Sequence, residues 1–345
     1  MRNRIKKMIA VLISACGILE VSRWLRARCF NKPSVTILCY HRIVPEGGLI
    51  SPQCISSDLF EKQMRFFSSK FDFITLDDVA SYLSGDIAFQ RDVMAFTFDD
   101  GYEDNYINAA PILERFDAKA AFYIASEPIL DGKNYWIDEL SILLEALHGS
   151  AAIVDLTELD DVAFKISQFI SAPEDQKKQQ AKNIFYAANA LNEGQKNKLL
   201  IELRKTCEVI GRTPNKTPTL MSVSQIKALM SRGHIIGAHT HTHPRLSNLT
   251  VDEVESEIFQ GVERLSEHFG EIKHFAYPFG KMADIPTDKS ALFNVLDRCG
   301  FKISVTTEDN VLAQSDHKYL VPRKVMSAQS VSQIDLKMEL MAWQR

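Results

Sequence analysis

Short apolar runs alternate with helical patterns along most of this chain. Apolar runs bounded by polar or turn-forming residues are typical of buried strands. Eight such runs predict strands: Val35–Tyr40, Phe73–Leu76, Val93–Phe98, Ala120–Ala125, His234–His239, Phe275–Tyr277, Phe301–Thr306 and Tyr319–Val321. Between them apolar residues recur at helical spacing, as they do from Val254 to Leu265 after Thr250. Strands that alternate with helices in this way predict a parallel sheet covered by helices.

The pattern changes in the middle of the chain. From Tyr135 to Thr219 there is little strand signal and much helix signal. We therefore predict three parts: a basic, apolar leader over residues 1–33, an α/β unit formed by residues 34–134 and 220–345, and a helical insertion over residues 135–219. Within the α/β unit, Asp58 and Glu61 form a capping-box-like pair that predicts a helix start.

Composition narrows the class of protein only a little. The chain has 345 residues, of which 46% are hydrophobic and 24% charged, as in an ordinary globular protein. The net charge of −4 gives no sign of a nucleic-acid-binding surface. The six cysteines include no C-x-x-C pair and predict no disulfide framework. Cys39 lies inside an apolar strand and is predicted to be a small core residue.

Charge is distributed unevenly between the leader and the rest. Residues 1–32 hold eight Lys and Arg against Glu20 alone, so this segment carries +7 and the remainder −11. A basic leader on an acidic body indicates a membrane surface as a partner. The uncharged stretch Met8–Leu19 has 12 residues, too few to span a bilayer.

Two modes of membrane attachment remain open for the leader. Ile13–Cys16 resembles a bacterial lipobox, in which Cys16 would become the lipidated N-terminus of an exported protein. Alternatively, Val21, Trp24 and Leu25 extend an apolar stripe among arginines, as in an uncleaved amphipathic helix lying on a membrane. Either mode predicts a membrane-associated bacterial protein, and the sequence does not decide between the cytoplasmic face and an exported lipoprotein.

Candidate chemistry is concentrated in two segments that each follow an apolar run. The first is Thr97–Tyr102, with the sequence TFDDGY, and the second is His239–His243, with the sequence HTHTH. Carboxylate and imidazole ligands suit a divalent metal ion, and a spare carboxylate could act as a general base. Each segment alone has an ordinary explanation, a turn for Asp-Asp-Gly and a solvated strand end for the histidines. Three of the nine histidines fall within five residues, which favours a metal-dependent enzyme.

These segments resemble the motifs of the polysaccharide deacetylase family, also called carbohydrate esterase family 4 or the NodB-homology domain. The family motifs T-F-D-D-G and H-[S/T]-x-x-H match Thr97–Gly101 and His239–His243. Two further segments are similar to the family, Tyr40–Ile43 and Phe275–Gly280, the latter with the sequence FAYPFG of an exopolysaccharide-deacetylase-like variant. The resemblance implies a distorted (β/α) barrel of about seven parallel strands, here with a helical insertion.

The resemblance also implies roles for individual residues. Asp100, His239 and His243 would hold the metal, which is typically zinc in this family and sometimes another divalent ion. Asp99 would be the general base, and the backbone N–H of Phe279 would bind the oxyanion of the tetrahedral intermediate. No role is assigned to His241.

The chain also departs from the family pattern. The third motif usually supplies an arginine that pairs with the catalytic aspartate, and here Ala276 occupies that position. We expect Arg323 to supply the missing charge. The family's L-x-H motif, which provides a general acid in many members, is not evident. His41, directly after the first strand, is the preferred candidate for that role over His317, which lies in a polar loop.

The expected function is a metal-dependent hydrolase that removes N-acetyl groups from hexosamine units of a polysaccharide or lipid-linked glycan. The expected partners are the glycan, a membrane surface contacted through the leader and other proteins of glycan biosynthesis, with no nucleic acid among them. Two alternatives stay open: an amidohydrolase or deacylase of the same fold that acts on a small non-glycan amide, and a catalytically inactive glycan-binding scaffold.

Overall fold

The computed structural model describes residues 13, 16–30, 33–45, 54–214, 219–326 and 331–343. The chain divides into two compact units. The first contains Ile55–Asp131 and Leu220–Arg345 together with the N-terminal part of the chain, and the second contains Gly132–Thr219.

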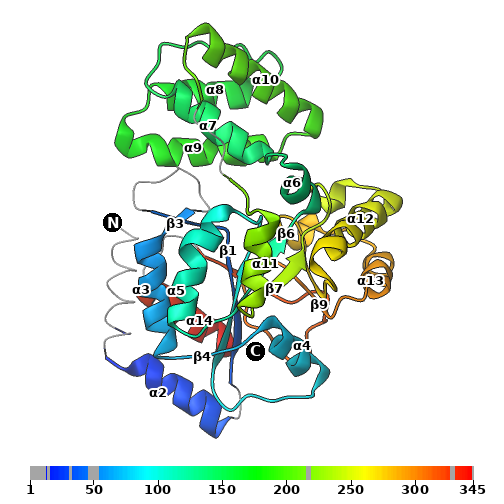
Figure 1. The fold of residues 1–345 in the computed structure, drawn as a ribbon. Coiled ribbons are helices and arrows are strands. Elements are labelled where there is room, and N and C mark those ends of the chain that lie inside the picture. The colour runs from blue at the N-terminus through cyan, green and yellow to red at the C-terminus, as the bar shows by residue number, and fades with distance from the viewer. Residues whose placement is uncertain are drawn as a thin grey trace. The chain divides into compact units, whose positions relative to one another are not determined.

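A curled parallel sheet forms the centre of the first unit (Figure 1). The spatial order of its main strands is β10-β1-β5-β6-β7-β8-β9, and every neighbouring pair is parallel. The bounds are β1 Val35–Tyr40, β5 Val93–Phe98, β6 Ala120–Ile124, β7 Ile235–Ala238, β8 His274–Ala276, β9 Ile303–Val305 and β10 Lys324–Val325. The predicted distorted (β/α) barrel of about seven parallel strands is confirmed.

Two shorter strand pairs complete the β structure. Strand β4 (Asp72–Phe73) pairs with the start of β5, and β2 (Arg42–Val44) pairs with β3 (Cys54–Ser56) in a separate two-stranded sheet. The predicted strand Phe73–Leu76 is therefore wrong beyond Phe73. Thr75 caps helix α4, because its hydroxyl accepts the N–H of Asp78 at 3.1 Å and the Asp78 carboxylate accepts the N–H of Thr75 at 2.8 Å.

The closing edge of the barrel also differs from the prediction. Tyr319–Val321 is not a strand and makes only an isolated parallel bridge, Val305↔Val321, with β9. The strand comes three residues later, where β10 pairs with β1. Residues 319–325 first contact β9 and then pair with β1. Each of these two strands therefore pairs with only one or two residues of the segment.

Helices surround the sheet of the first unit (Figure 1). They are α2 Ile18–Trp24, α3 Ser57–Ser68, α4 Leu76–Ser84, α5 Ala110–Arg115, α6 Ser126–Asp131, α11 Val223–Ser231, α12 Val251–Phe269, α13 Lys289–Arg298 and α14 Val331–Trp343. Short π-helical and 3₁₀ turns are η1 Leu25–Cys29, η2 Asn105–Ala109, η3 Leu246–Asn248 and η4 Met282–Asp284. Helix α3 is capped by Ser56, whose hydroxyl accepts the N–H of Leu59 at 3.3 Å, and not by Asp58 as predicted.

Strand alternation gives the sheet two apolar faces with different partners. In β5, Met94, Phe96 and Phe98 join the core beneath the surrounding helices. Val93 and Ala95 belong to a smaller cluster on the concave face, inside the barrel. The same alternation continues past the strand end, so it directs Asp99 toward the inside of the barrel.

The second unit is helical and has its own apolar core. Its helices are α7 Trp136–Leu147, α8 Asp160–Ile170, α9 Glu174–Asn189 and α10 Glu193–Val209. Buried leucines, isoleucines and phenylalanines from all four helices form that core. A unit with a contiguous core of this kind has the physical basis for stability of its own.

Part of the leader lies outside the described residues, namely residues 1–12, 14, 15, 31 and 32, which include half of the lipobox-like segment. The described part forms α2 and η1, which belong to the first unit. Two of its arginines, Arg23 and Arg26, are buried in ion pairs. Among the described residues, none of the helices combines the length and the apolar character needed to cross a bilayer.

Candidate active site

Asp99 and Asp100 are held at the carboxyl end of β5 by a strained turn. The N–H of Asp99 donates to the carbonyl of Tyr40 at 2.9 Å, which ties this end of β5 to β1. Asp100 and Gly101 both have positive φ, 73° and 70°. A Cβ at Gly101 would lie 2.8 Å from a methyl group of Ile124, so a side chain there would be strained by both backbone and packing. The turn directs the two adjacent carboxylates to different surroundings.

The loop after β7 brings His239 and His243 together. Thr240 and His243 have positive φ, 67° and 64°, and the N–H of His243 donates to the hydroxyl of Thr240 at 3.1 Å. The two imidazole rings have centroids 4.8 Å apart. His241 turns the other way, and its Nδ1 lies 2.7 Å from the hydroxyl of Ser126. The backbone of the loop therefore separates the three histidines that an extended strand would place on one face.

Asp100, His239 and His243 form a compact group of potential metal ligands. The Asp100 Oδ1 atom lies 3.6 Å from His239 Nε2 and 3.3 Å from His243 Nε2, and one ligand atom from each residue falls within 4.8 Å of the others. His239 Nδ1 lies 2.7 Å from the carbonyl oxygen of Ala276, so Nδ1 carries the proton and Nε2 offers a lone pair to the group. This donor set of one carboxylate and two imidazoles fits a catalytic divalent ion.

The protonation states of the group also suit a cation. Burial, reinforced by the neighbouring His243, lowers the pKa of His239 to about 4, so its imidazole is neutral at pH 7. Burial alone would raise the pKa of Asp100, but the hydrogen bond with His243 and the interactions with His243, His41 and His239 together outweigh burial and hold that pKa below its ordinary value. Metal binding requires neutral imidazoles and an ionised carboxylate.

Asp99 is paired with Arg323, which reaches it from the segment before β10. The guanidinium NH1 and NH2 groups donate to Asp99 Oδ1 at 2.7 Å and to Oδ2 at 2.8 Å. Arg323 also donates to the carbonyl of Thr306 at 3.0 Å and to the hydroxyl of Thr97 at 2.9 Å. Both charged side chains are almost completely buried. Bidentate geometry and two further acceptors are what a buried ion pair needs in order to offset its desolvation.

The Arg323 pair determines the charge of Asp99. Burial alone would raise the pKa of Asp99, but the charge and hydrogen bonds of Arg323, together with the nearby His239 and His41, outweigh burial and lower that pKa below the ordinary value. The charge of Asp99 in turn raises the pKa of Arg323, against the effect of burial. Asp99 is therefore ionised at neutral pH and able to accept a proton.

Two residues of the β1 end lie beside Asp99. One ligand atom from each of Cys39, His41 and Asp99 falls within 4.8 Å of the others, and the Cys39 thiol donates to Asp99 Oδ2 at 3.4 Å. Oδ2 thus accepts from both Arg323 and Cys39, whereas Oδ1 accepts only from Arg323 among the described residues. Oδ1 is the oxygen with a lone pair to spare. The sequence analysis placed Cys39 in the core and did not connect it with this carboxylate.

Phe279 lies on a tight turn after β8 and next to the histidines. Its φ is 61°, the N–H of Gly280 donates to the carbonyl of Pro278 at 2.7 Å, and the Phe279 carbonyl accepts from the Thr307 hydroxyl at 2.8 Å. The Phe279 ring centroid lies 5.3 Å from that of His243. Among the residues that the structure describes, the Phe279 N–H has no acceptor.

Helix α12 supports the histidine loop from outside, which the sequence did not reveal. One Glu257 carboxylate oxygen accepts the N–H groups of His241 at 3.1 Å and Thr242 at 2.9 Å, and the other accepts the Thr242 hydroxyl at 2.8 Å. One helical turn later, a Cβ at Gly261 would lie 2.7 Å from the carbonyl carbon of Thr240, so glycine is needed for this close approach. No local pattern on α12 distinguishes Glu257 from its other acidic residues.

Backbone strain is concentrated at this site. Six described non-glycine residues have positive φ, and four of them are Asp100, Thr240, His243 and Phe279. Such conformations cost on the order of 1–3 kcal/mol each and persist where the surroundings enforce them. The structure thus brings together the predicted residues Asp99, Asp100, His239, His243, His41 and Arg323, with Phe279 beside His243, and leaves His241 and His317 out of the cluster.

Comparisons with known proteins agree with this geometry. A sequence model of the polysaccharide deacetylase family matches residues 86–141 and 177–302. These ranges contain both aspartates and the histidine loop but neither His41 nor Arg323. The Bacillus subtilis protein YxkH, named as a candidate polysaccharide deacetylase, is 28% identical over 132 residues, which is 38% of this chain and 44% of YxkH. The aligned region thus spans less than half the length of that relative.

Solved structures share the fold. A Streptococcus pyogenes deacetylase, PplD, solved in complex with acetate, has a TM-score of 0.54 at 19% identity, covering 88% of this chain and 98% of PplD. IcaB from Ammonifex degensii has a TM-score of 0.57 at 19% identity, covering 88% of this chain and 97% of IcaB.

Proposed function

The chain belongs to the polysaccharide deacetylase family, and from that premise we propose that it is a hydrolase that removes N-acetyl groups from hexosamine units of a glycan, with a divalent metal ion, typically zinc, as cofactor. Members of this family cleave the C–N bond of N-acetyl groups. One observation carries the proposal. A buried, ionised Asp99 held by Arg323 stands directly beside a metal-ligand group made of Asp100, His239 and His243.

Separate residues of the site have separate roles in the proposed reaction. A bound divalent ion would polarise the acetyl carbonyl and lower the pKa of the attacking water. Asp99 would accept the proton of that water through Oδ1, the oxygen with a spare lone pair. The Phe279 N–H, which has no acceptor among the described residues, would donate to the developing oxyanion.

Protonation of the leaving amine is the role we propose for His41. It lies next to Asp99 at the end of β1, and its side chain is partly exposed, as contact with a substrate would require. Its neighbours Arg42 and Ile43 are fixed by Asp104, whose carboxylate accepts the Arg42 Nε–H at 2.8 Å and the Ile43 N–H at 2.9 Å. A rigid segment after the strand end holds His41 in place.

The test is acetate release from N-acetylated hexosamine oligomers by the full chain loaded with zinc. Asp99→Asn should retain zinc while its rate falls by ~10²–10⁴, since one proton-transfer group typically contributes this much. Loss of zinc in this variant would show that the roles of the two aspartates are reversed. A small non-glycan N-acetyl amide, assayed in parallel, should be a poorer substrate. Preferential cleavage of the small amide would contradict the glycan assignment.

A further inference from the structure

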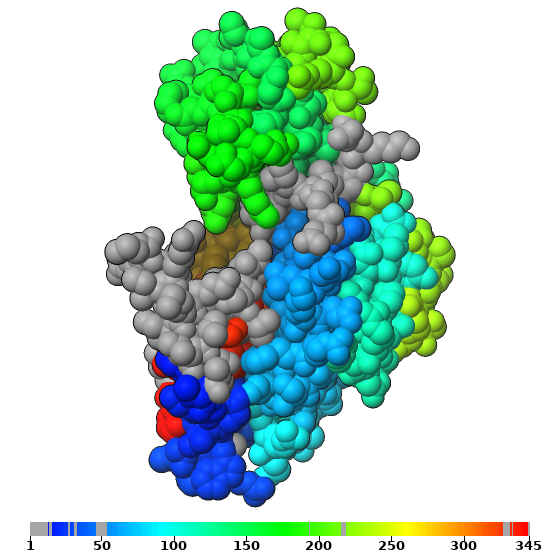
Figure 2. All heavy atoms as spheres, turned by 90° about the vertical axis from the view of Figure 1, so that its left-hand side faces the viewer, coloured from blue at the N-terminus to red at the C-terminus, as the bar shows by residue number. Residues whose placement is uncertain are grey.

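Helices α2 and α14 present an exposed apolar surface on the first unit, which we call the α2/α14 face. Figure 2 shows the N-terminal segment in blue and the C-terminal helix in red close together on one side of the molecule. Ile18, Val21 and Trp24 are 55%, 60% and 59% exposed. The face is completed by Leu25, Phe30, Leu340 and Trp343. The rings of Phe30 and Trp343 meet edge to face at 5.5 Å, which joins the two segments into one surface.

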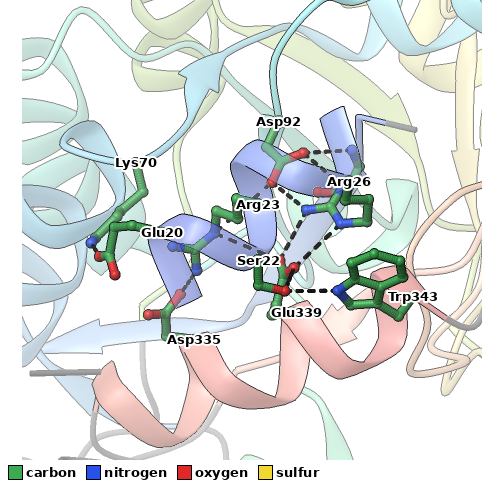
Figure 3. A network of polar contacts seen from close by, with 10 residues as sticks. Glu20, Ser22, Arg23, Arg26, Lys70, Asp92, Asp335, Glu339 and Trp343 are labelled. Carbon is green, nitrogen blue, oxygen red and sulfur yellow. Dashed lines mark hydrogen bonds and ion pairs between the residues drawn. The ribbon is translucent and has the colours of Figure 1, made fainter. Parts of the chain in front are cut away.

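The inward side of α2 and of the turn η1 that follows it carries two buried, ion-paired arginines (Figure 3). Arg26 is bidentate on Asp92, at 2.9 and 2.6 Å, and its NH2 group also donates to Glu339 at 2.9 Å. Arg23 pairs with Asp335, and both arginines are buried. Removing one partner from a buried ion pair is strongly destabilising, so these contacts hold α2 in place.

Helix α2 therefore has an inverted polarity. In a water-soluble amphipathic helix the apolar side faces the core and the charged side faces solvent. Here Arg23 of α2 and Arg26 of the following turn η1 face the protein beside the buried Leu19, and Ile18, Val21 and Trp24 face outward. A contiguous apolar surface of this kind marks an interaction site. A medium or partner that covers this side of α2 would therefore have to be apolar, at least in part.

We propose that the α2/α14 face docks on an anionic lipid surface. The chain before α2 carries Arg2, Arg4, Lys6 and Lys7, followed by the apolar run Met8–Leu12, so basic and apolar sequence leads directly into the face. Arg28, on the same segment, is exposed. Tryptophan at the edge of an apolar face, with basic residues nearby, is typical of segments that lie in the bilayer interface, and each basic residue near an anionic leaflet adds affinity.

Docking in this way would place the proposed active site away from the lipid. Asp92, which pairs with Arg23 of α2 and Arg26 of η1, directly precedes β5, and Asp99 directly follows it. A six-residue strand spans ~20 Å. The anchored helix and the metal-ligand group thus lie at opposite ends of β5. If the proposed deacetylation is correct, this arrangement favours a glycan polymer that extends from the membrane over a sugar attached directly to a lipid.

The experiment is co-sedimentation of the full chain with vesicles of phosphatidylcholine alone, or of phosphatidylcholine and phosphatidylglycerol in equal parts. All samples carry Cys16→Ser, so that an acyl chain on Cys16 does not contribute. We expect binding to the anionic vesicles only. Val21→Ser with Trp24→Ser should lower the partition coefficient by ~100-fold, because burying each such side chain is worth about a decade in binding. The control pair Val209→Ser with Tyr186→Ser removes an exposed valine and aromatic from the helical unit and should change nothing.

Two results would overturn the inference. One is anionic-vesicle binding that the Val21 and Trp24 substitutions leave unchanged, since another segment would then hold the lipid. The other is self-association, seen by sedimentation equilibrium and abolished by the same substitutions, without vesicle binding, because the partner would then be a second copy. Acetate release from soluble oligomers should be the same in both pairs of variants. If the wild-type chain releases no acetate while lipid binding behaves as expected, the proposed function fails and the docking inference stands.

Discussion

Arg323 holds both carboxylate oxygens of Asp99 although the two residues are 224 positions apart in the chain. The pair lies inside the barrel, where the guanidinium carbon also sits 5.4 Å from the centre of the Tyr123 ring. An ionised carboxylate in these surroundings depends on its partner, because desolvation would otherwise favour the neutral acid. The Asp99–Arg323 contact therefore links the stability of the barrel to the chemistry that we propose for it.

Arg323→Met should destabilise the protein by about 3–5 kcal/mol, because it leaves the Asp99 charge buried and unpaired. Urea unfolding of the metal-free protein at neutral pH measures this. Arg323→Lys keeps a positive charge but loses the bidentate geometry, so it should destabilise the protein less than Arg323→Met does. Combining Asp99→Asn with Arg323→Met should recover part of the stability. Equal stability of wild type and Arg323→Met would refute a structural role for the pair.

Replacement of His239 or Asp100 by Ala should abolish stoichiometric zinc binding while the barrel stays folded. Each residue supplies one of the three ligand atoms that lie within 4.8 Å of one another. Equilibrium dialysis and circular dichroism give the two readouts. His241→Ala is the matched control, since this histidine belongs to the same loop but contacts Ser126. A comparable loss of zinc in His241→Ala would mean that the ligand set is misassigned.

Glu257→Ala should weaken zinc binding by ~10–100-fold, the usual effect of removing a group that orients metal ligands. Its carboxylate accepts two N–H groups and one hydroxyl of the loop between His239 and His243, so its loss frees the loop to adopt other conformations. The zinc affinity of Glu257→Gln, which keeps a hydrogen-bond acceptor, should lie between those of the wild type and Glu257→Ala. The exposed Glu263 on the same helix provides the control, Glu263→Ala, with unchanged affinity. Competition titration with a chromophoric chelator measures all four proteins.

The metal-free protein should lose stability as the pH falls from 6.5 toward 4. Burial lowers the pKa of His234 to about 4, from an ordinary value of 6.5, and its Nδ1 accepts the N–H of Ala120 at 3.1 Å. In this window the unfolded chain binds a proton that the folded chain excludes, so acid favours unfolding. The contribution of neutral His234 to stability is present in full above pH 6.5 and is lost progressively as the pH falls to about 4, the pKa of His234 in the folded protein.

His234→Asn tests this assignment, because the asparagine Oδ1 can still accept the Ala120 N–H but does not titrate. The slope of unfolding free energy against pH should decrease by about 1.4 kcal/mol per pH unit, the value for one proton. Urea unfolding at several pH values with a chelator present provides the slopes. The pKa of His239 is also lowered by folding, so the unfolding free energy of the variant should still depend on pH to some extent. An unchanged slope would show that His234 does not contribute.

Local pattern was sufficient for much of the barrel. The predicted strands Val35–Tyr40 and Val93–Phe98 match β1 and β5 in both bounds, because fully buried strands are continuous apolar runs that end at polar residues. The helix expected after Thr250 begins there, with a capping box between Thr250 and Glu253. The expectation that the TFDDG and HTHTH segments meet also came from local pattern, because each follows a predicted strand and parallel strands place the residues after them at one edge of the sheet.

Only the tertiary structure determined the contacts that depend on strand register, on how the barrel closes and on the path of the loops. The sequence suggested Arg323 as a partner for Asp99 only through family resemblance, and the contact itself depends on how the chain crosses from β9 to β10. The periodicity of an extended strand would have placed all three histidines of His239–His243 on one face, whereas positive φ at Thr240 and His243 separates His241 from the others.

The same distinction applies to charge. Arg23 and Arg26 form part of a basic leader in the sequence, yet the fold buries them against Asp92, Asp335 and Glu339 and turns Ile18, Val21 and Trp24 outward. Composition records how many charges a segment carries, and only the folded chain determines which of them meet a partner more than 300 residues away. Glu257 is the same kind of case, because a helix pattern does not specify which exposed carboxylate will face a neighbouring loop.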